Sequence, residues 1–268
     1  ERNKGDLGGA LYVTVRNDPT QVLSMFTKDV TFTSNLANQN GGALCIDGSD
    51  DITITYKLNM THSIFKSNQA MIKGGTISMK YSELTLNEFQ EDGSNAVESG
   101  GFASIEKSTF NAAHGHIKDT YVNYIKGNGG VFNINGGSIV TLNELQMYSE
   151  KGYTAQTAKT PAPGYCTDSE QGACYSASMG GAFYVTDINT DVKLNKCEVN
   201  GYVTEPEEGL GGGIYVTTSA KLTLKDTKIK HCNATSGGVL FVGSDTTVKI
   251  LQHSEISDCR SIYEAAGV

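Results

Sequence analysis

The sequence predicts an all-β protein that folds as a right-handed parallel β-helix, a solenoid of about eight coils of roughly thirty residues with three parallel sheets. Two observations carry this prediction. A pair of glycines recurs eight times along the 268 residues, and each pair opens a short strand of alternating apolar residues. The composition agrees, because 31 glycines, 4 prolines and no tryptophan are typical of short strands separated by many turns.

The glycine pairs follow one another at steps of 26 to 33 residues, with one longer step of 51. In each unit the fourth and sixth residues are apolar, like Leu11 and Val13 in the first unit. Strand side chains alternate between faces, so these two positions share a buried face. We expect the glycines to form a bend, either through a positive φ or through close approach of neighbouring coils. The predicted repeat turns are Gly8, Gly9, Gly41, Gly42, Gly74, Gly75, Gly100, Gly101, Gly129, Gly130, Gly180, Gly181, Gly211, Gly212, Gly237 and Gly238.

Two further strands are expected in each coil. A second alternating strand follows most glycine units, at residues 52–55, 84–86, 140–142, 192–194, 222–224 and 248–250. A third, less regular apolar segment is marked by Phe32, Phe65, Val199, Ile229 and Ile256. Three strands per coil predict three parallel sheets around one core, which only stacked coils can bury. We therefore expect a single β-helix domain over residues 1–268, with a lateral loop inserted at 151–179.

Two other β architectures fit less well. A β-propeller normally needs a repeat of about forty residues or more, with four strands in each blade. A β-sandwich need not repeat a glycine pair in register. The recurrence of a glycine pair at the start of each apolar strand, with most steps shorter than forty residues, therefore favours the β-helix.

The charge balance excludes some partners. The net charge of −8 argues against nucleic-acid binding, because a phosphate backbone attracts clustered Lys and Arg. No apolar run approaches the eighteen or so residues needed to cross a bilayer, so we expect no membrane insertion.

Two stretches carry a recognisable motif. Residues 32–35 read Phe-Thr-Ser-Asn before Gly-Gly-Ala-Leu at 41–44, and residues 65–68 read Phe-Lys-Ser-Asn before Gly-Gly-Thr-Ile at 74–77. This pattern resembles the repeat of polymorphic outer-membrane proteins, which combines Phe-x-x-Asn with Gly-Gly-Ala-Ile/Leu/Val, and the similar repeats of very large protist surface proteins. The resemblance implies a right-handed parallel β-helix displayed at a cell surface, where it serves adhesion. The glycine half of the motif spans the whole chain, whereas the Phe-x-x-Asn half is clear only in these two coils.

Six cysteines occur without a Cys-x-x-Cys pair, and an even number without metal spacing suits disulfides in an oxidising compartment. Cys232 and Cys259 stand three residues after equivalent core positions of successive coils. Their side chains should be neighbours, which predicts a disulfide between them, with two buried free thiols as the alternative.

The insertion contains Cys166 and Cys174, eight residues apart, and a local disulfide that closes a lateral loop is predicted there. Long loops on a rigid scaffold often carry binding, and the alternative, which the sequence slightly favours, is a stapled loop without a ligand. Cys45 and Cys197 are left without an assigned partner.

Asn59 and Asn233 begin Asn-x-Thr triplets and are candidate glycosylation sites in a eukaryotic secretory pathway. Together with the cysteines they favour an extracellular or cell-surface protein.

We expect no catalytic site, no metal and no cofactor. Cleavage of a glycosidic bond requires two acids at a defined separation, and the sequence shows no such set. His114 and His116 are the one close histidine pair, without an apparent third metal ligand. Several parallel β-helices are polysaccharide lyases or hydrolases, so a carbohydrate-active or carbohydrate-binding β-helix is the alternative. Convergent acids or a stacked aromatic groove would favour it.

Both chain ends fall at nearly the same phase of the coil, and neither shows a polar capping element. Open solenoid ends invite strand addition, so we expect either a piece of a longer β-helix or copies that stack head to tail. The sequence therefore favours an extracellular structural or adhesive protein, acting as a fibre subunit or surface rod. The expected partners are further copies of the chain, bound head to tail or laterally, and a surface glycan or another surface protein.

Overall fold

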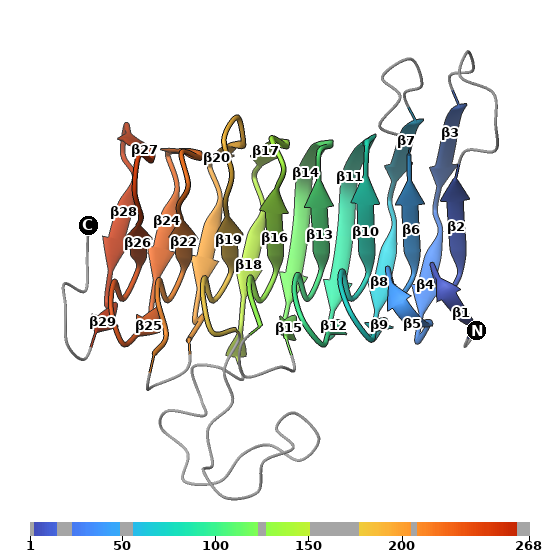
Figure 1. Cartoon of the computed structure of the whole chain (residues 1–268), viewed down its shortest axis with the longest axis horizontal. Coiled ribbons are helices and arrows are strands. Elements are labelled where there is room, and N and C mark those ends of the chain that lie inside the picture. The colour runs from blue at the N-terminus through green and yellow to red at the C-terminus, as the bar shows by residue number, and fades with distance from the viewer. Residues whose placement is uncertain are drawn as a thin grey trace, which may run out of the picture.

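The computed structural model describes residues 3–14, 23–48, 56–122, 127–150, 177–204 and 208–261, which form a parallel β-helix (Figure 1). The coils succeed one another along the long axis of a rod, so the predicted fold class is confirmed. The eight strands of the most regular sheet enclose about seven turns, one fewer than predicted. In this part of the chain no helix is long and apolar enough to cross a membrane.

The strands predicted after the glycine pairs form one sheet, here called sheet B, in which each begins two residues after its second glycine. Ile77 lies opposite Leu44 and Ala103, and Met79 lies opposite Ile46 and Ile105, so the fourth and sixth positions form buried columns as predicted. The strands of sheet B, in order, are β2 (Leu11–Thr14), β6 (Leu44–Asp47), β10 (Ile77–Lys80), β13 (Ala103–Glu106), β16 (Phe132–Asn135), β19 (Phe183–Val185), β22 (Ile214–Val216) and β26 (Leu240–Val242).

The two glycines of a pair meet different requirements. Gly74, the first of its pair, has a φ of 64°, a conformation that side chains with a Cβ rarely adopt. Gly75 follows, and a Cβ there would lie 2.1 Å from the carbonyl oxygen of Gly101 in the next coil. It would also lie 2.5 Å from the carbonyl carbon of Asn95. The positive φ therefore explains the first glycine of the pair, and the close approach of neighbouring coils explains the second.

The second and third predicted strands lie in the same sheet, here called sheet C, so the prediction of a separate sheet for the third segment was wrong. The chain bends between them at a residue with positive φ, such as His62 or Lys196, both at 52°. The first half of sheet C contains β3 (Leu23–Lys28), β7 (Tyr56–Thr61), β17 (Ile139–Asn143), β20 (Asp191–Asn195), β23 (Lys221–Lys225) and β27 (Thr247–Leu251). The second half contains β4 (Thr31–Thr33), β8 (Ile64–Lys66), β18 (Gln146–Tyr148), β21 (Glu198–Asn200), β24 (Lys228–Lys230) and β28 (Glu255–Ser257).

Two long strands, β11 (Ser82–Asp92) and β14 (Thr109–Lys118), run through both halves of sheet C. Leu58 and Met60 of β7 lie opposite Leu84 and Leu86 of β11. The strand predicted at residues 52–55 lies outside the described residues. The insertion at 151–179 is described only from residue 177 onward.

The strands that form the third sheet, sheet A, were not predicted. This sheet joins very short segments that lie between the Phe-x-x-Asn motif and the glycine pair. Its strands are β1 (Lys4–Leu7), β5 (Leu36–Asn40), β9 (Gln69–Ala70), β12 (Asn95–Ala96) and β15 (Tyr121–Val122). At the equivalent place in the last coils, β25 (Asn233–Ala234) pairs with β29 (Arg260–Ser261).

Phenylalanine rings stack along the core and connect successive coils. Phe32 and Phe65 stack at a centroid distance of 5.3 Å, and Phe132 and Phe183 stack at 5.1 Å. Between them, Phe102 makes edge contacts with Phe65 at 6.1 Å and with Phe132 at 5.5 Å. Such aromatic pairs contribute about 0.5–1.5 kcal/mol each beyond their burial. The core is therefore one continuous apolar column.

Inward-pointing asparagines form a ladder beside this column. The backbone N–H and the Nδ2 of Asn35 both donate to Oδ1 of Asn68, at 3.1 and 2.9 Å. The backbone N–H of Asn68 in turn donates to Oγ of Ser94 at 2.9 Å. Buried amides cost free energy unless they are hydrogen-bonded. The Asn of the Phe-x-x-Asn motif therefore pairs with buried polar groups of the neighbouring coils.

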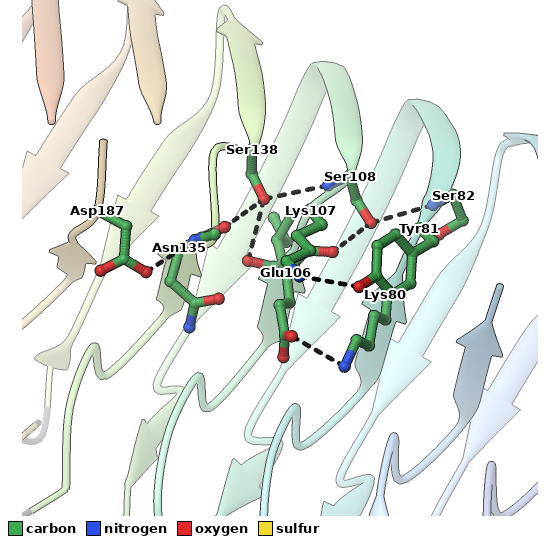
Figure 2. A network of polar contacts seen from close by, with 11 residues as sticks. Lys80, Tyr81, Ser82, Glu106, Lys107, Ser108, Asn135, Ser138 and Asp187 are labelled. Atoms are coloured by element: carbon green, nitrogen blue, oxygen red, sulfur yellow. Dashed lines mark hydrogen bonds and ion pairs between the residues drawn. The ribbon is translucent and has the colours of Figure 1, made fainter. Parts of the chain in front are cut away.

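A second ladder lies at the corner between sheets B and C (Figure 2). The backbone N–H of Ser82 donates to Oγ of Ser108 at 3.1 Å, and that of Ser108 donates to Oγ of Ser138 at 3.2 Å. Outside this ladder, Lys107 Nζ donates to the hydroxyl of Tyr81 at 2.8 Å (Figure 2). Each corner of the rod is therefore held by hydrogen bonds that pass from coil to coil.

Candidate functional site

A hollow of about 430 Å³, lined mainly by polar residues and here called the polar hollow, opens on the outer face of sheet C. It lies over β18 and β21 and at the end of β24, whose chain continues into His231. Its size falls in the range of about 300–1,000 Å³ that is typical of small-molecule sites. Among the described residues it is lined by Gln146, Met147, Tyr148, Ser149, Glu150, Glu198, Asn200, Gly201 and His231.

The register of sheet C explains why the hollow forms. Gln146 lies opposite Glu198, and Tyr148 lies opposite Asn200, while Met147 between them points into the core. The position that follows these strands is held by Ser149, Gly201 and His231 in successive coils. Gly201 has a φ of 80° and no side chain, so it leaves a depression between its two neighbours.

One wall of the hollow is formed by Asn200 and His231, whose side chains hold each other. Nδ1 of His231 lies 2.9 Å from Oδ1 of Asn200. An amide oxygen only accepts, so Nδ1 carries the hydrogen and donates it. Nε2 of His231 then faces the carboxylate of Asp258 at 3.8 Å.

The opposite wall is fixed by Lys118 and Glu150. Lys118 Nζ lies 3.1 Å from Oε2 of Glu150 and 5.7 Å from the centre of the Tyr148 ring. The hydrogen bond to Glu150 raises the pKa of Lys118, so this lysine stays charged. The backbone N–H of Glu150 donates to Oδ1 of Asp119 at 2.9 Å. Both walls are therefore ordered by contacts that do not involve a ligand.

The hollow was not predicted residue by residue, but it lies on the coil where the sequence shows its longest step. Ser149 and Gly201 are neighbours in space and lie on either side of the insertion in the sequence. Only the register of the strands brings them together.

Cys232 and Cys259 are neighbours, as predicted, but both are free thiols in the structure, so the predicted disulfide is not formed there. The backbone N–H of Cys232 donates to Sγ of Cys259 at 3.3 Å. Asn35 makes the equivalent bond with Asn68, so the cysteines occupy the ladder position of the motif. The hydrogen bond between the thiols raises the pKa of Cys232 and lowers that of Cys259, which makes Cys259 the first to ionise.

Two further cysteines lie within the described residues. Cys45, on β6, and Cys197, just before β21, are free and buried. Burial raises the pKa of the Cys45 thiol to about 12 and that of Cys197 to about 11. Thiols that stay protonated react slowly. Cys166 and Cys174 lie outside the described residues, so their predicted disulfide stays a prediction.

The two predicted glycosylation sites differ in accessibility. Asn59 is exposed on the outer face of β7. Asn233 is only 7% exposed on β25, and its backbone lies against Gly212. A glycan on Asn233 requires this side chain to leave its place, whereas one on Asn59 does not.

Aromatic residues form an outward ladder on the last strands of sheet B. Tyr184 and Tyr215 stack at 5.2 Å with an interplanar angle of 1°, and Tyr215 and Phe241 stack at 5.2 Å and 7°. Tyr12, which recurs at the same position in the sequence, lies beside Cys45. Because the stacked ring faces contact one another, the ladder presents mainly ring edges. It is therefore unsuited to the face-on stacking of a sugar ring.

The stretch around Phe32 shows what the sequence motif does in three dimensions. Phe32 is a core ring, Asn35 belongs to the inner ladder, and Gly41 and Gly42 turn the chain into sheet B. Residues 29–47 match the Chlamydia polymorphic membrane protein repeat. The predicted resemblance is thus confirmed, and the polymorphic membrane protein repeat corresponds here to the part of one coil that runs through β4, β5 and β6. No curated protein and no solved structure matches the chain.

Proposed function

We propose that this chain is a surface-displayed structural rod that serves adhesion. The observation that carries the proposal is the uninterrupted register of sheet B from β2 to β26, together with the match to the Chlamydia polymorphic membrane protein repeat. That repeat points to a protein of the cell surface. A solenoid of identical strand spacing is a stiff spacer, because each coil is held by core contacts and hydrogen bonds to both neighbours.

The long axis of the rod suits association end to end. On the last described coil, Val242 is 43% exposed and Ile250 is 38% exposed. Their counterparts one coil earlier, Val216 and Leu224, are 0% and 1% exposed. In the interior of the rod a following coil covers these positions, and we propose that further copies of the chain associate through such exposed apolar positions.

Within the described ranges, no three His, Cys, Asp or Glu side chains are placed to hold a metal ion. The carbohydrate-active alternative has one observation in its favour, because Glu150 and Glu198 line the same hollow.

Two measurements on the full chain test the proposal. Negative-stain electron microscopy should show rods or filaments with lengths in multiples of one molecule, and beads coated with the chain should bind host or neighbouring cells. Dispersed single particles in the micrographs, together with bead binding no stronger than that of beads coated with an unrelated protein, would contradict the adhesive rod. Oligosaccharides incubated with the chain should be recovered intact, and shortened products would instead support the carbohydrate-active alternative.

A further inference from the structure

We propose that the polar hollow on sheet C binds one or two units of a neutral oligosaccharide. This inference rests on the proposed adhesive function and gives it a recognition site. The site consists of side chains from two successive coils, at Gln146 and Tyr148 on β18 and at Glu198 and Asn200 on β21, with His231 at the rim.

The hydrogen-bonding groups match the chemistry of sugar hydroxyls. A hydroxyl donates one hydrogen and accepts others, so it is best held by a mixture of donors and acceptors. Gln146 and Asn200 supply amides, which contain both, and Glu198 supplies a carboxylate, which only accepts. The Tyr148 hydroxyl and the imidazole of His231 complete a mixed set around one opening.

The walls are ordered before a ligand arrives. Asn200 is held by His231 at 2.9 Å, and Glu150 is held by Lys118 at 3.1 Å. A ligand therefore has to immobilise few side chains, which lowers the entropic cost of binding.

The charges favour a neutral sugar over an acidic one. The two acidic side chains that line the hollow are Glu150 and Glu198. Lys118 neutralises Glu150 from outside the lining and is itself engaged by that contact. Glu198 lies opposite Lys228 in the register of β21 and β24, so each of the two acids has a lysine beside it and the opening offers no strong attraction for a sulfated or carboxylated glycan. A metal ligand is disfavoured as well, because Glu150, Glu198 and His231 do not form a metal-binding group in the described structure.

The test is an array of neutral oligosaccharides, printed beside sulfated and sialylated versions, probed with the full chain. The strongest neutral binder is then titrated by calorimetry against wild type, Asn200→Ala, Glu198→Gln and the control Asn111→Ala. Asn111 is an outward residue of β14 on the same sheet and does not line the hollow. Glu198→Gln keeps the shape of the side chain and serves if Asn200→Ala fails to fold.

We expect wild type to bind at least one neutral oligosaccharide and to discriminate against its acidic version. Asn200→Ala and Glu198→Gln should weaken binding at least tenfold, while Asn111→Ala stays within twofold of wild type. Absence of any neutral binder, or equal affinity in all four proteins, would overturn the inference. If cell binding and rods persist in that case, the proposed adhesive rod stands without this site; if both are lost, the proposed function itself is wrong.

Discussion

Glu91 stands in a column of otherwise apolar core residues. Its neighbours in the adjacent strands of sheet C are Phe65 and Ile117. The carboxyl is 2% exposed, with Oε2 accepting from Thr76 Oγ1 at 2.8 Å and Oε1 accepting from the Ser94 N–H at 3.1 Å. Burial outweighs these hydrogen bonds and raises the pKa of Glu91 to about 8. At neutral pH the carboxyl is therefore mostly protonated in the folded chain.

This buried acid makes stability depend on pH. The folded pKa lies above the ordinary value of 4.5, so the contribution is complete in acid and is lost as the pH rises toward about 8. Relative to Glu91→Gln, which does not titrate, wild type should lose on the order of 4 kcal/mol of unfolding free energy across that window. Urea unfolding at about pH 4, 6 and 8 measures the difference.

The control is Glu83→Gln, which alters an acid of the same strand that pairs with Lys57 at the surface. It should keep the wild-type pH slope. Parallel slopes for wild type and Glu91→Gln would contradict a buried, protonated Glu91.

Cys232 and Cys259 carry a second prediction at this scale. Strands that pair lie ~4.8 Å apart, within the range of about 4.4–6.8 Å between the Cα atoms of a disulfide. We expect the two thiols to form a disulfide with oxidised glutathione as the oxidant: the Cys259 thiolate attacks it and releases one reduced glutathione, and Cys232 then displaces the second from the mixed disulfide. Intact mass after alkylation without reductant measures this: two modified thiols at these positions would contradict the pairing, and Cys45 and Cys197 serve as internal references for unpaired buried thiols.

Single residues also show where sequence reasoning stops. The third strand of each coil was recognised at Phe32, Phe65, Val199, Ile229 and Ile256. It was missed where Glu91 takes the same position, because a carboxyl breaks the apolar pattern that defines the segment. Only pairing with Phe65 and Ile117 reveals that Glu91 belongs to the core.

Among the elements, sheet B was predictable because its glycine pairs and alternating residues recur in phase. Sheet A was not, since strands such as β9 and β12 contain two residues each, too few to show any alternation. The merging of the second and third strands into sheet C was also hidden. The bend between them uses ordinary residues with positive φ, such as His62 and Lys196, in place of glycine.

The polar hollow on sheet C could not be predicted either, because it is formed by residues from different coils. Ser149, Gly201 and His231 follow equivalent strands, but the insertion separates the first from the second. The absence of a side chain at Gly201 can be recognised as a depression only when its neighbours in the adjacent coils are known.

The glycine pairs yield a prediction at the scale of the element. A Cβ at Gly75 would lie 2.1 Å from the carbonyl oxygen of Gly101, so Gly75→Ala should push two coils apart and cost roughly 3 kcal/mol or more. Gly137 is the matched control, since its φ is 83° but the nearest atom to a Cβ is 3.5 Å away. Gly137→Ala should cost only about 1–2 kcal/mol. Thermal unfolding of both variants measures the costs, and equal losses would show that crowding at Gly75 is relieved.

At the scale of the whole molecule, the proposed association of copies should depend on Val242 and Ile250, the exposed core-position residues of the last described coil. The double variant Val242→Asp, Ile250→Asp should abolish end-to-end association, because a charge cannot be buried unpaired between two coils. Both side chains are already more than one-third exposed, so the unfolding midpoint should change little.

Sedimentation velocity over a range of concentrations measures this assembly. Ile188→Asp is the control, since Ile188 is 66% exposed on a turn at the side of the rod. It should associate like wild type. Unchanged association in the double variant would place any contact between copies elsewhere.

The parallel ladders of sheets B and C also determine how the rod responds to force. Figure 1 shows the strands of successive coils stacked along the long axis of the rod, so the hydrogen bonds that join paired strands run along that axis. Tension applied evenly to the two end faces is shared by every bond of one interface at once, so the rod resists stretching strongly. Tension on the chain termini instead concentrates on the outermost strand, and the coils then peel away one at a time. The same molecule is therefore mechanically strong or weak according to where its load is attached.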